Sequence, residues 1–170
     1  MQLPVLGLQF WMEIEIGGSA KEALIASSQG VLFIGSIAKD VIMQDSCIVL
    51  SEKRNLKLAR CKVRDLSLSG SPTLEQIQDR LRDIGYSSCD PEVPLRVHLR
   101  MNTQKNKGTF WYIMKPIADS KGELRIFREN LSHDGCTWCL HALPINLLGQ
   151  DPPDRRFERD DEIVFGVPNA

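Results

Sequence analysis

The strict two-residue alternation near the start of the chain constrains the fold more than any other feature. Every second side chain from position 6 to position 16 is apolar: Leu6, Leu8, Phe10, Met12, Ile14 and Ile16. The residues between them are mostly polar or small, apart from Trp11. Because successive side chains of a strand point to opposite faces, this segment predicts a strand with one buried face.

Similar patterns predict a sheet throughout the chain, with few helices. We expect further strands over residues 31–37, 41–50, 55–68, 95–101, 109–117, 123–128, 137–143 and 163–167. A phase change near Ala59 and another near Asp65 predict a bulge or break in the strand at 55–68. Short turns between strands favour antiparallel pairing. The predicted class is therefore α+β, predominantly β, with an antiparallel meander and one or two helices packed against it.

Two segments have helical signals. Ser19 and Glu22 have capping-box spacing before a short run of helix formers, residues 20–26. Leu74, Ile77, Leu81 and Ile84 form one apolar stripe after Ser71 and Pro72, which are suited to cap and first-turn positions. The break at residues 69–72 suggests a β-rich N-terminal subdomain, 1–69, and a helix followed by a meander, 70–170; a single compact domain is the alternative.

Charge and cysteine content bound the class of protein. The net charge is −1, but residues 51–107 carry twelve Lys/Arg against seven Asp/Glu, while both flanking segments are acidic. This basic middle segment either binds an anion or pairs with the flanks. The chain has no apolar stretch of the roughly 20 residues needed to span a membrane. Five irregularly spaced cysteines predict free thiols in a reducing compartment, so we expect a soluble, cytoplasmic protein.

One cluster has metal-ligand spacing. Cys136 and Cys139 lie two residues apart in the zinc-ligand pattern, and His141 adds a third candidate. A structural zinc site needs a fourth ligand, and no second such pair exists in the sequence. The favoured interpretation is a strand with ordinary thiols and no cofactor; a zinc site or a thiol-dependent enzyme is the alternative.

A second cluster is basic. In a strand over 95–101, Arg96, His98 and Arg100 share one face, with Lys105 and Lys107 in the following loop and Trp111 on the next strand. Phosphate pairing and base stacking on such a face would bind single-stranded nucleic acid. The competing interpretation is a solvated sheet face with cross-strand ion pairs to Glu123 or Glu129.

The sequence contains no motif that supports catalysis. It lacks a G-x-S-x-G elbow, a phosphate-binding glycine loop and a calcium loop. We therefore predict a non-enzymatic binding or assembly module that contacts a partner protein or a second copy of itself. The expected contact residues are Trp11, Trp111 and the face formed by Arg96 and Arg100.

Overall fold

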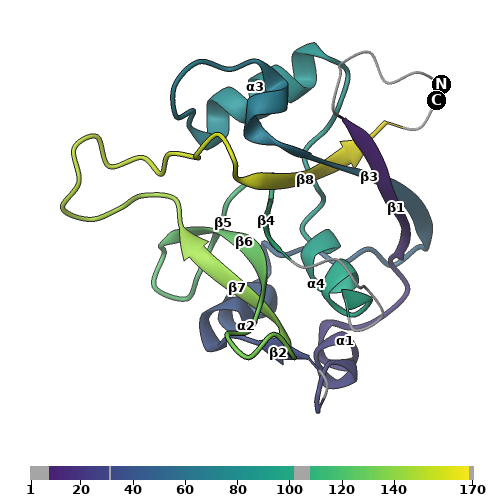
Figure 1. Ribbon diagram of the computed structural model, residues 1–170. Coiled ribbons are helices and arrows are strands. Elements are labelled where there is room, and N and C mark those ends of the chain that lie inside the picture. The colour runs from purple at the N-terminus through teal and green to yellow at the C-terminus, as the bar shows by residue number, and fades with distance from the viewer. Residues whose placement is uncertain (1–7, 31, 102–107, 169–170) are drawn as a thin grey trace.

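The computed structural model describes residues 8–30, 32–101 and 108–168, and it is built around one mixed sheet (Figure 1). Within these residues the sheet has eight strands: β1 (Gln9–Ile16), β2 (Phe33–Ile34), β3 (Arg54–Lys62), β4 (Thr109–Tyr112), β5 (Ile117–Ala118), β6 (Leu124–Leu131), β7 (Trp138–Pro144) and β8 (Glu162–Val167). Their order is β1-β3-β8-β4-β6-β7-β2, and β5 pairs with β6. The α+β class is confirmed.

The predicted pure meander is wrong. Among the described strands, β5, β6 and β7 follow one another as antiparallel neighbours, and β4 also pairs antiparallel with β6. The last strand, β8, returns between β3 and β4 and is parallel to β4, while β2 is parallel to β7. Since β3 and β8 pair, the segments 1–69 and 70–170 share one sheet and one hydrophobic core.

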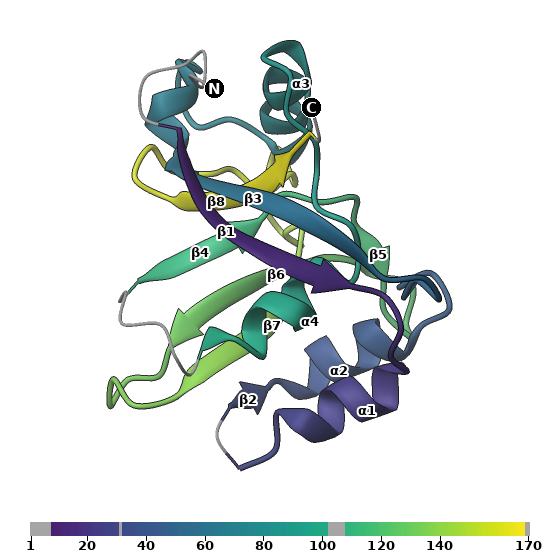
Figure 2. The same ribbon diagram turned by 90° about the vertical axis from the view of Figure 1, so that its right-hand side faces the viewer.

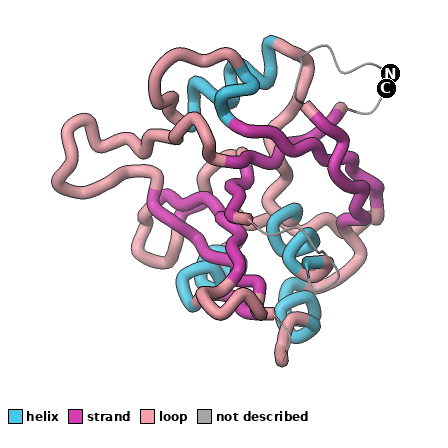
Figure 3. Tube along the Cα trace, viewed as in Figure 1, coloured by secondary structure: helices cyan, strands magenta, loops and turns pink. Residues whose placement is uncertain are grey.

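The helices form two groups on opposite sides of the sheet (Figure 3). They are α1 (Lys21–Ser27), α2 (Ser36–Met43), α3 (Leu74–Asp83) and α4 (Val93–His98), with a 3₁₀ turn, η1 (Val63–Leu66), after β3. α3 lies over β3 and β8, whereas α4 lies between β1 and the strands β6 and β7 (Figure 2). Among the described residues, no helix is long and apolar enough to cross a membrane.

Two predicted strands are replaced by helix α2. Of the described residues 32–37, only Phe33 and Ile34 form a strand, and the first part of the strand expected at 41–50 lies in the helix. Ala38, Val41 and Ile42 are buried, at the three- and four-residue spacing of a helix face. The β-branched residues that suggested strands therefore pack as a helix next to β7, because tertiary contacts override propensity.

The predicted strand at 95–101 is also wrong, because Val93–His98 forms α4. Pro94 lies in the first turn, where a missing backbone N–H costs nothing. This helix moves Arg96, His98 and Arg100 off the sheet, which changes every site hypothesis that used them.

The two predicted helices are confirmed, but their predicted caps are not. Thr73, rather than Ser71, caps α3: its hydroxyl accepts from Gln76 N at 3.2 Å, and the Gln76 side chain accepts from Thr73 N. α1 begins after Ala20 without a side-chain cap, so Ser19 does not form the expected box.

The predicted bulge or break in the strand near Ala59 is wrong, since β3 is continuous there and the irregularity lies in its partner strand β1. The register shift lies between Phe10 and Met12 of β1, opposite Ala59 and Leu58, and places Trp11 in a bulge. β3 itself runs without a break until Lys62, where η1 begins.

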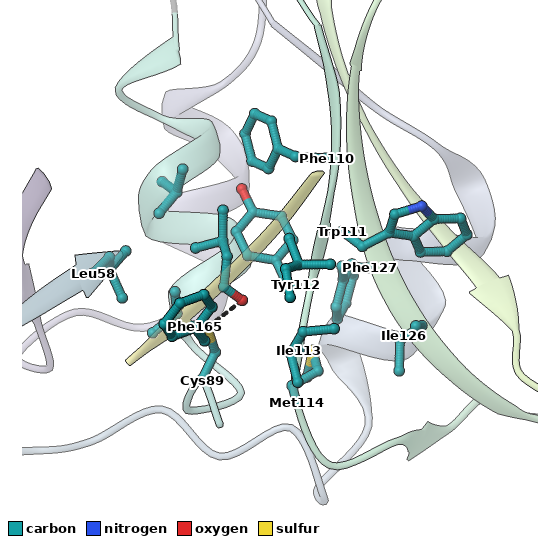
Figure 4. Close-up of a cluster of buried hydrophobic side chains, with 14 of the residues drawn as sticks. Leu58, Cys89, Phe110, Trp111, Tyr112, Ile113, Met114, Ile126, Phe127 and Phe165 are labelled. Carbon is teal, nitrogen blue, oxygen red and sulfur yellow. Dashed lines mark hydrogen bonds between the residues drawn. The ribbon is translucent and has the colours of Figure 1, made fainter. Parts of the chain in front are cut away.

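The core is aromatic and lies on the inner side of the curved sheet. Phe110 and Tyr112 of β4 are fully buried, with ring centroids 5.5 Å apart. Figure 4 shows Trp111 projecting from β4 to the opposite side. The two faces of β4 therefore meet different surroundings, an aromatic core on one side and the segment between β7 and β8 on the other.

Candidate functional site

The free edge of β1 faces α4, and three polar side chains connect them. Glu92, Arg96 and Arg100 follow one another at four-residue intervals, so they lie along one side of this segment. Glu92 Oε1 accepts from Gly17 N at 2.8 Å, and Arg96 Nη2 donates to Gly17 O at 2.7 Å. Arg100 Nη1 donates to Glu13 O. Side chains from the α4 segment thus bind the backbone in the middle of β1 and directly after its end.

A groove of about 500 Å³ lies between this edge and α4. Its apolar part is formed by Ile14, which is buried, and Leu99, which is half-buried. The polar lining comes from both walls: Glu13, Glu15, Asn55, Arg96 and Arg100. The groove therefore combines a small apolar floor with carboxylates on the strand side and guanidiniums on the helix side.

The alternation of β1 turns backbone groups into this groove. In an antiparallel pair, alternate residues direct both backbone groups toward the partner strand, and the others direct both away. The Glu13 carbonyl accepts from Arg100, and the Gly17 backbone is bonded by Glu92 and Arg96. The backbone groups of the odd-numbered residues 13–17 therefore point away from β3. Glu15 lies between them in the same phase. Its N–H and C=O are therefore turned toward the groove.

Ion pairs fix the charge of both walls. Glu92 is 1% exposed, and Arg96 Nε donates to its Oε1 at 2.7 Å. Leu50 N donates to the other oxygen of Glu92 at 3.1 Å, so both oxygens of this buried carboxylate accept hydrogen bonds. On the strand side, a hydrogen bond and charge attraction from Lys53 lower the pKa of Glu15, with a smaller contribution from Arg96. Glu15 is thus an anion at neutral pH.

His98 does not join its predicted neighbours in this groove. It is fully buried on another side of α4, where its Nδ1 lies 2.6 Å from Glu129 Oε1. The predicted basic face of Arg96, His98 and Arg100 therefore does not form. Lys105 and Lys107 lie outside the described residues.

The two predicted tryptophan contacts differ in exposure. Trp11 is half-buried in the β1 bulge, edge-on to Phe110 at 5.1 Å and below the guanidinium of Arg60. Trp111 is only 5% exposed, so its indole offers almost no surface to a partner. The cause is the segment after β7, which folds back and places Phe157 against the indole, with ring centroids 5.4 Å apart.

The candidate metal ligands are dispersed along β7 and the turn before it. Cys136 is exposed, whereas Cys139 is 9% exposed and burial raises the pKa of its thiol. His141 is half-buried, and burial followed by repulsion from Arg128 lowers its pKa. Among the described residues, no group of three or more His, Cys, Asp or Glu side chains is arranged to hold a metal ion. The described cysteines form no disulfide.

Sequence reasoning missed the strand wall of the groove and Glu92. A usable signal was present, since Glu92 and Arg96 have the four-residue spacing of a helical ion pair. The alternation of Leu95, Val97 and Leu99 predicted a strand instead, and this prediction was preferred to the helical spacing of Glu92 and Arg96. The partnership of α4 with β1, about 80 positions apart, has no local signature.

Comparison of the chain with protein-family models, with curated proteins and with solved structures found no match.

Proposed function

We propose that this protein is a non-enzymatic binding module that holds an extended segment of a partner protein in the groove between β1 and α4. Sheet edges recognise peptides by offering backbone hydrogen bonds, and a neighbouring helix then supplies the side-chain contacts. The observation that carries this proposal is the phase of β1, which turns the backbone of Glu13 and Glu15 away from β3 and toward α4.

The composition of the groove supports a peptide. Its volume of about 500 Å³ lies within the range of roughly 300–1,000 Å³ that is typical of ligand sites. Ile14 and Leu99 offer a small apolar contact to one side chain. The guanidinium of Arg96 is anchored by the buried Glu92, so it is held in position for a carboxylate or carbonyl at modest entropic cost.

A single-stranded nucleic acid is less well supported. The basic strand that motivated it is absent, and the carboxylates of Glu13 and Glu15 line the same groove as the arginines. Negative charge beside a phosphate chain opposes binding. A thiol- or zinc-dependent enzyme is supported by no cluster in the described parts of the chain.

The test is selection of peptides from a random displayed library on the purified protein, followed by mapping with amide chemical shifts. Selected peptides should shift the resonances of Glu13–Ile16 and of Arg96–Arg100. Asn55→Trp, on an exposed position of the groove wall, should fill the groove and weaken binding by about tenfold or more. Arg100→Ala should also weaken it.

Arg82→Ala is the matched control, because Arg82 is an exposed arginine on α3, away from the groove, that pairs with the exposed Asp79. Peptides that bind all variants equally, or that shift other regions, would contradict the proposal. Concentration-dependent self-association that Asn55→Trp abolishes would make a second copy the occupant. Salt-sensitive binding of a single-stranded oligonucleotide in the groove would instead favour nucleic acid.

A further inference from the structure

The outer face of the sheet carries a row of residues that continues across five strands. Directly paired residues share a face, and the pairings join Cys61, Ile163, Trp111, Arg128 and His141 in that order. The row is buried and apolar on β3 and β8, and it becomes half-buried and basic on β6 and β7. This face is remote from the groove, since α4 contacts Glu129, whose side chain points to the other side of β6.

Two guanidiniums contact one buried indole on this face. Arg128 lies over the Trp111 ring at 5.2 Å from its centroid, and Arg155 lies over it at 5.0 Å. Arg155 reaches this place because the segment between β7 and β8 folds back, with its Nε donating to Pro144 O at 2.8 Å. Two positive charges thus converge on one aromatic side chain.

Neither charge is neutralised locally. Arg60, Arg96 and Arg125, which are half-buried or buried, each form an ion pair with a carboxylate, and the half-buried Arg80 donates its Nε to the carbonyl oxygen of Leu66. Within the described residues Arg128 and Arg155 have no carboxylate oxygen within 4.0 Å, and the buried Nε of Arg128 has no hydrogen-bond partner. A buried charged donor without a partner is costly, so this arrangement calls for a ligand.

The electrostatics agree with the geometry. Burial lowers the pKa of Arg128, and burial together with repulsion from Arg128 lowers the pKa of Arg155. Asp161 opposes both shifts from a longer distance. His141, next in the row, has its pKa lowered by burial and by Arg128, so it adds a neutral imidazole rather than a third charge.

We propose that Arg128 and Arg155 form an oxyanion-binding site beside Trp111 on the outer face of the sheet. The ligand is a phosphate or carboxylate group, whose oxygens accept the charge-assisted N–H bonds that the protein leaves unmade. Cation–π contact with the indole holds both guanidiniums near the surface in the absence of the anion.

The test uses inorganic phosphate, and sodium acetate in a parallel arm, against sodium chloride of equal ionic strength. Binding is followed by the thermal midpoint and by the ¹⁵N–¹H resonance of Arg128 Nε. Phosphate should raise the midpoint saturably and shift this resonance. Arg128→Gln and Arg155→Gln should each weaken binding by about tenfold or more. Acetate acting alone would identify the ligand as a carboxylate, and phosphate acting alone would identify a phosphate group.

Arg156→Gln is the matched control, because Arg156 is adjacent in sequence, exposed and away from the indole. It should bind as the unmodified protein does. Phosphate also stabilises proteins by exclusion from their surfaces, but that effect is unsaturable and equal in all variants. Equal, unsaturable stabilisation of all four proteins, with an unmoved Arg128 resonance, would overturn the proposal. The two arginines would then serve only to hold the β7–β8 segment on Trp111.

Discussion

The buried pair of Glu129 and His98 yields a prediction about stability and pH. Glu129 Oε1 lies 2.6 Å from His98 Nδ1, and Tyr112 donates its hydroxyl to Oε2 at 3.2 Å. All three side chains have no exposure. Burial raises the pKa of Glu129 above its ordinary value of 4.5, although hydrogen bonds from His98 and Tyr112 oppose this shift.

The sign of the pH dependence follows from this direction. The folded protein holds the Glu129 proton more tightly than the unfolded chain does, so this group stabilises the fold fully below about pH 4.5. The contribution is lost as the pH rises through the folded-state pKa of Glu129. If folding takes up one proton, the free energy of unfolding falls by about 1.4 kcal/mol for each pH unit, and this is the slope of stability with pH.

Glu129→Gln should remove this slope. The amide resembles a protonated carboxyl group, since it can donate to His98 and accept from Tyr112. At low pH the substitution should cost only about 0.5–1.5 kcal/mol, the worth of an imperfectly replaced hydrogen bond. Above pH 4.5 the unmodified protein loses stability relative to the variant, so the difference should shrink and then reverse.

Urea unfolding of both proteins between about pH 5 and pH 8 measures this difference. Contributions from distant groups such as Asp119 and Glu15 cancel, because both proteins contain them. Tyr112→Phe is the control, since it keeps the Glu129 carboxyl group and should keep the slope. A difference that is constant at about 3–5 kcal/mol would refute the reasoning, because it would mean that Glu129 is ionised across this pH range in the folded protein.

Three further predictions concern the fold itself. Thr73→Ala should cost about 1 kcal/mol in urea unfolding by removing the α3 cap, whereas Ser71→Ala should change stability by less than about 0.5 kcal/mol. In the native protein Cys136 should react with a thiol reagent far faster than the four buried cysteines, and all five should react after denaturation. Gly17→Ala should destabilise by more than about 2 kcal/mol, because at φ +86° its Cβ would lie 2.0 Å from a backbone oxygen, whereas Gly122→Ala, with a similar φ and open space, should cost about 1–2 kcal/mol.

Elements that carry a clear periodic pattern of apolar residues in their own sequence were predictable. α3 carries its own apolar stripe, and Leu74, Ile77 and Leu81 are indeed buried. The alternation of β1 correctly marks Ile14 and Ile16 as buried, but it fails before the bulge, where Phe10 is 57% exposed. Periodicity is sufficient in these cases because one face is buried and the other is wet.

Elements defined by distant partners were not predictable. β8 inserts between β3 and β4, and no local pattern reports that parallel pairing. Trp111 alternates as a surface residue would, yet Arg155 and Phe157 return from a proline-rich loop to cover it. The basic face that the sequence suggested for Arg96, His98 and Arg100 does not form, and the guanidiniums that lie over Trp111 belong to Arg128 and Arg155.

The wrong prediction of a strand at 95–101 also made the predicted basic site wrong, because the site was placed on a face of that strand. As a strand, this segment would bury Leu95, Val97 and Leu99 and expose His98 between Arg96 and Arg100. In the structure His98 is as buried as Val97, and its Nδ1 has a partner in Glu129 from β6, whereas its buried Nε2 has no hydrogen-bond partner among the described residues. Counting His98 as a core residue turns the period-two pattern into a helical one and leaves Arg96 and Arg100 together, four residues apart, on the side that faces β1. A single buried polar pair, which only the tertiary fold can form, therefore decides both the helix and the composition of the groove.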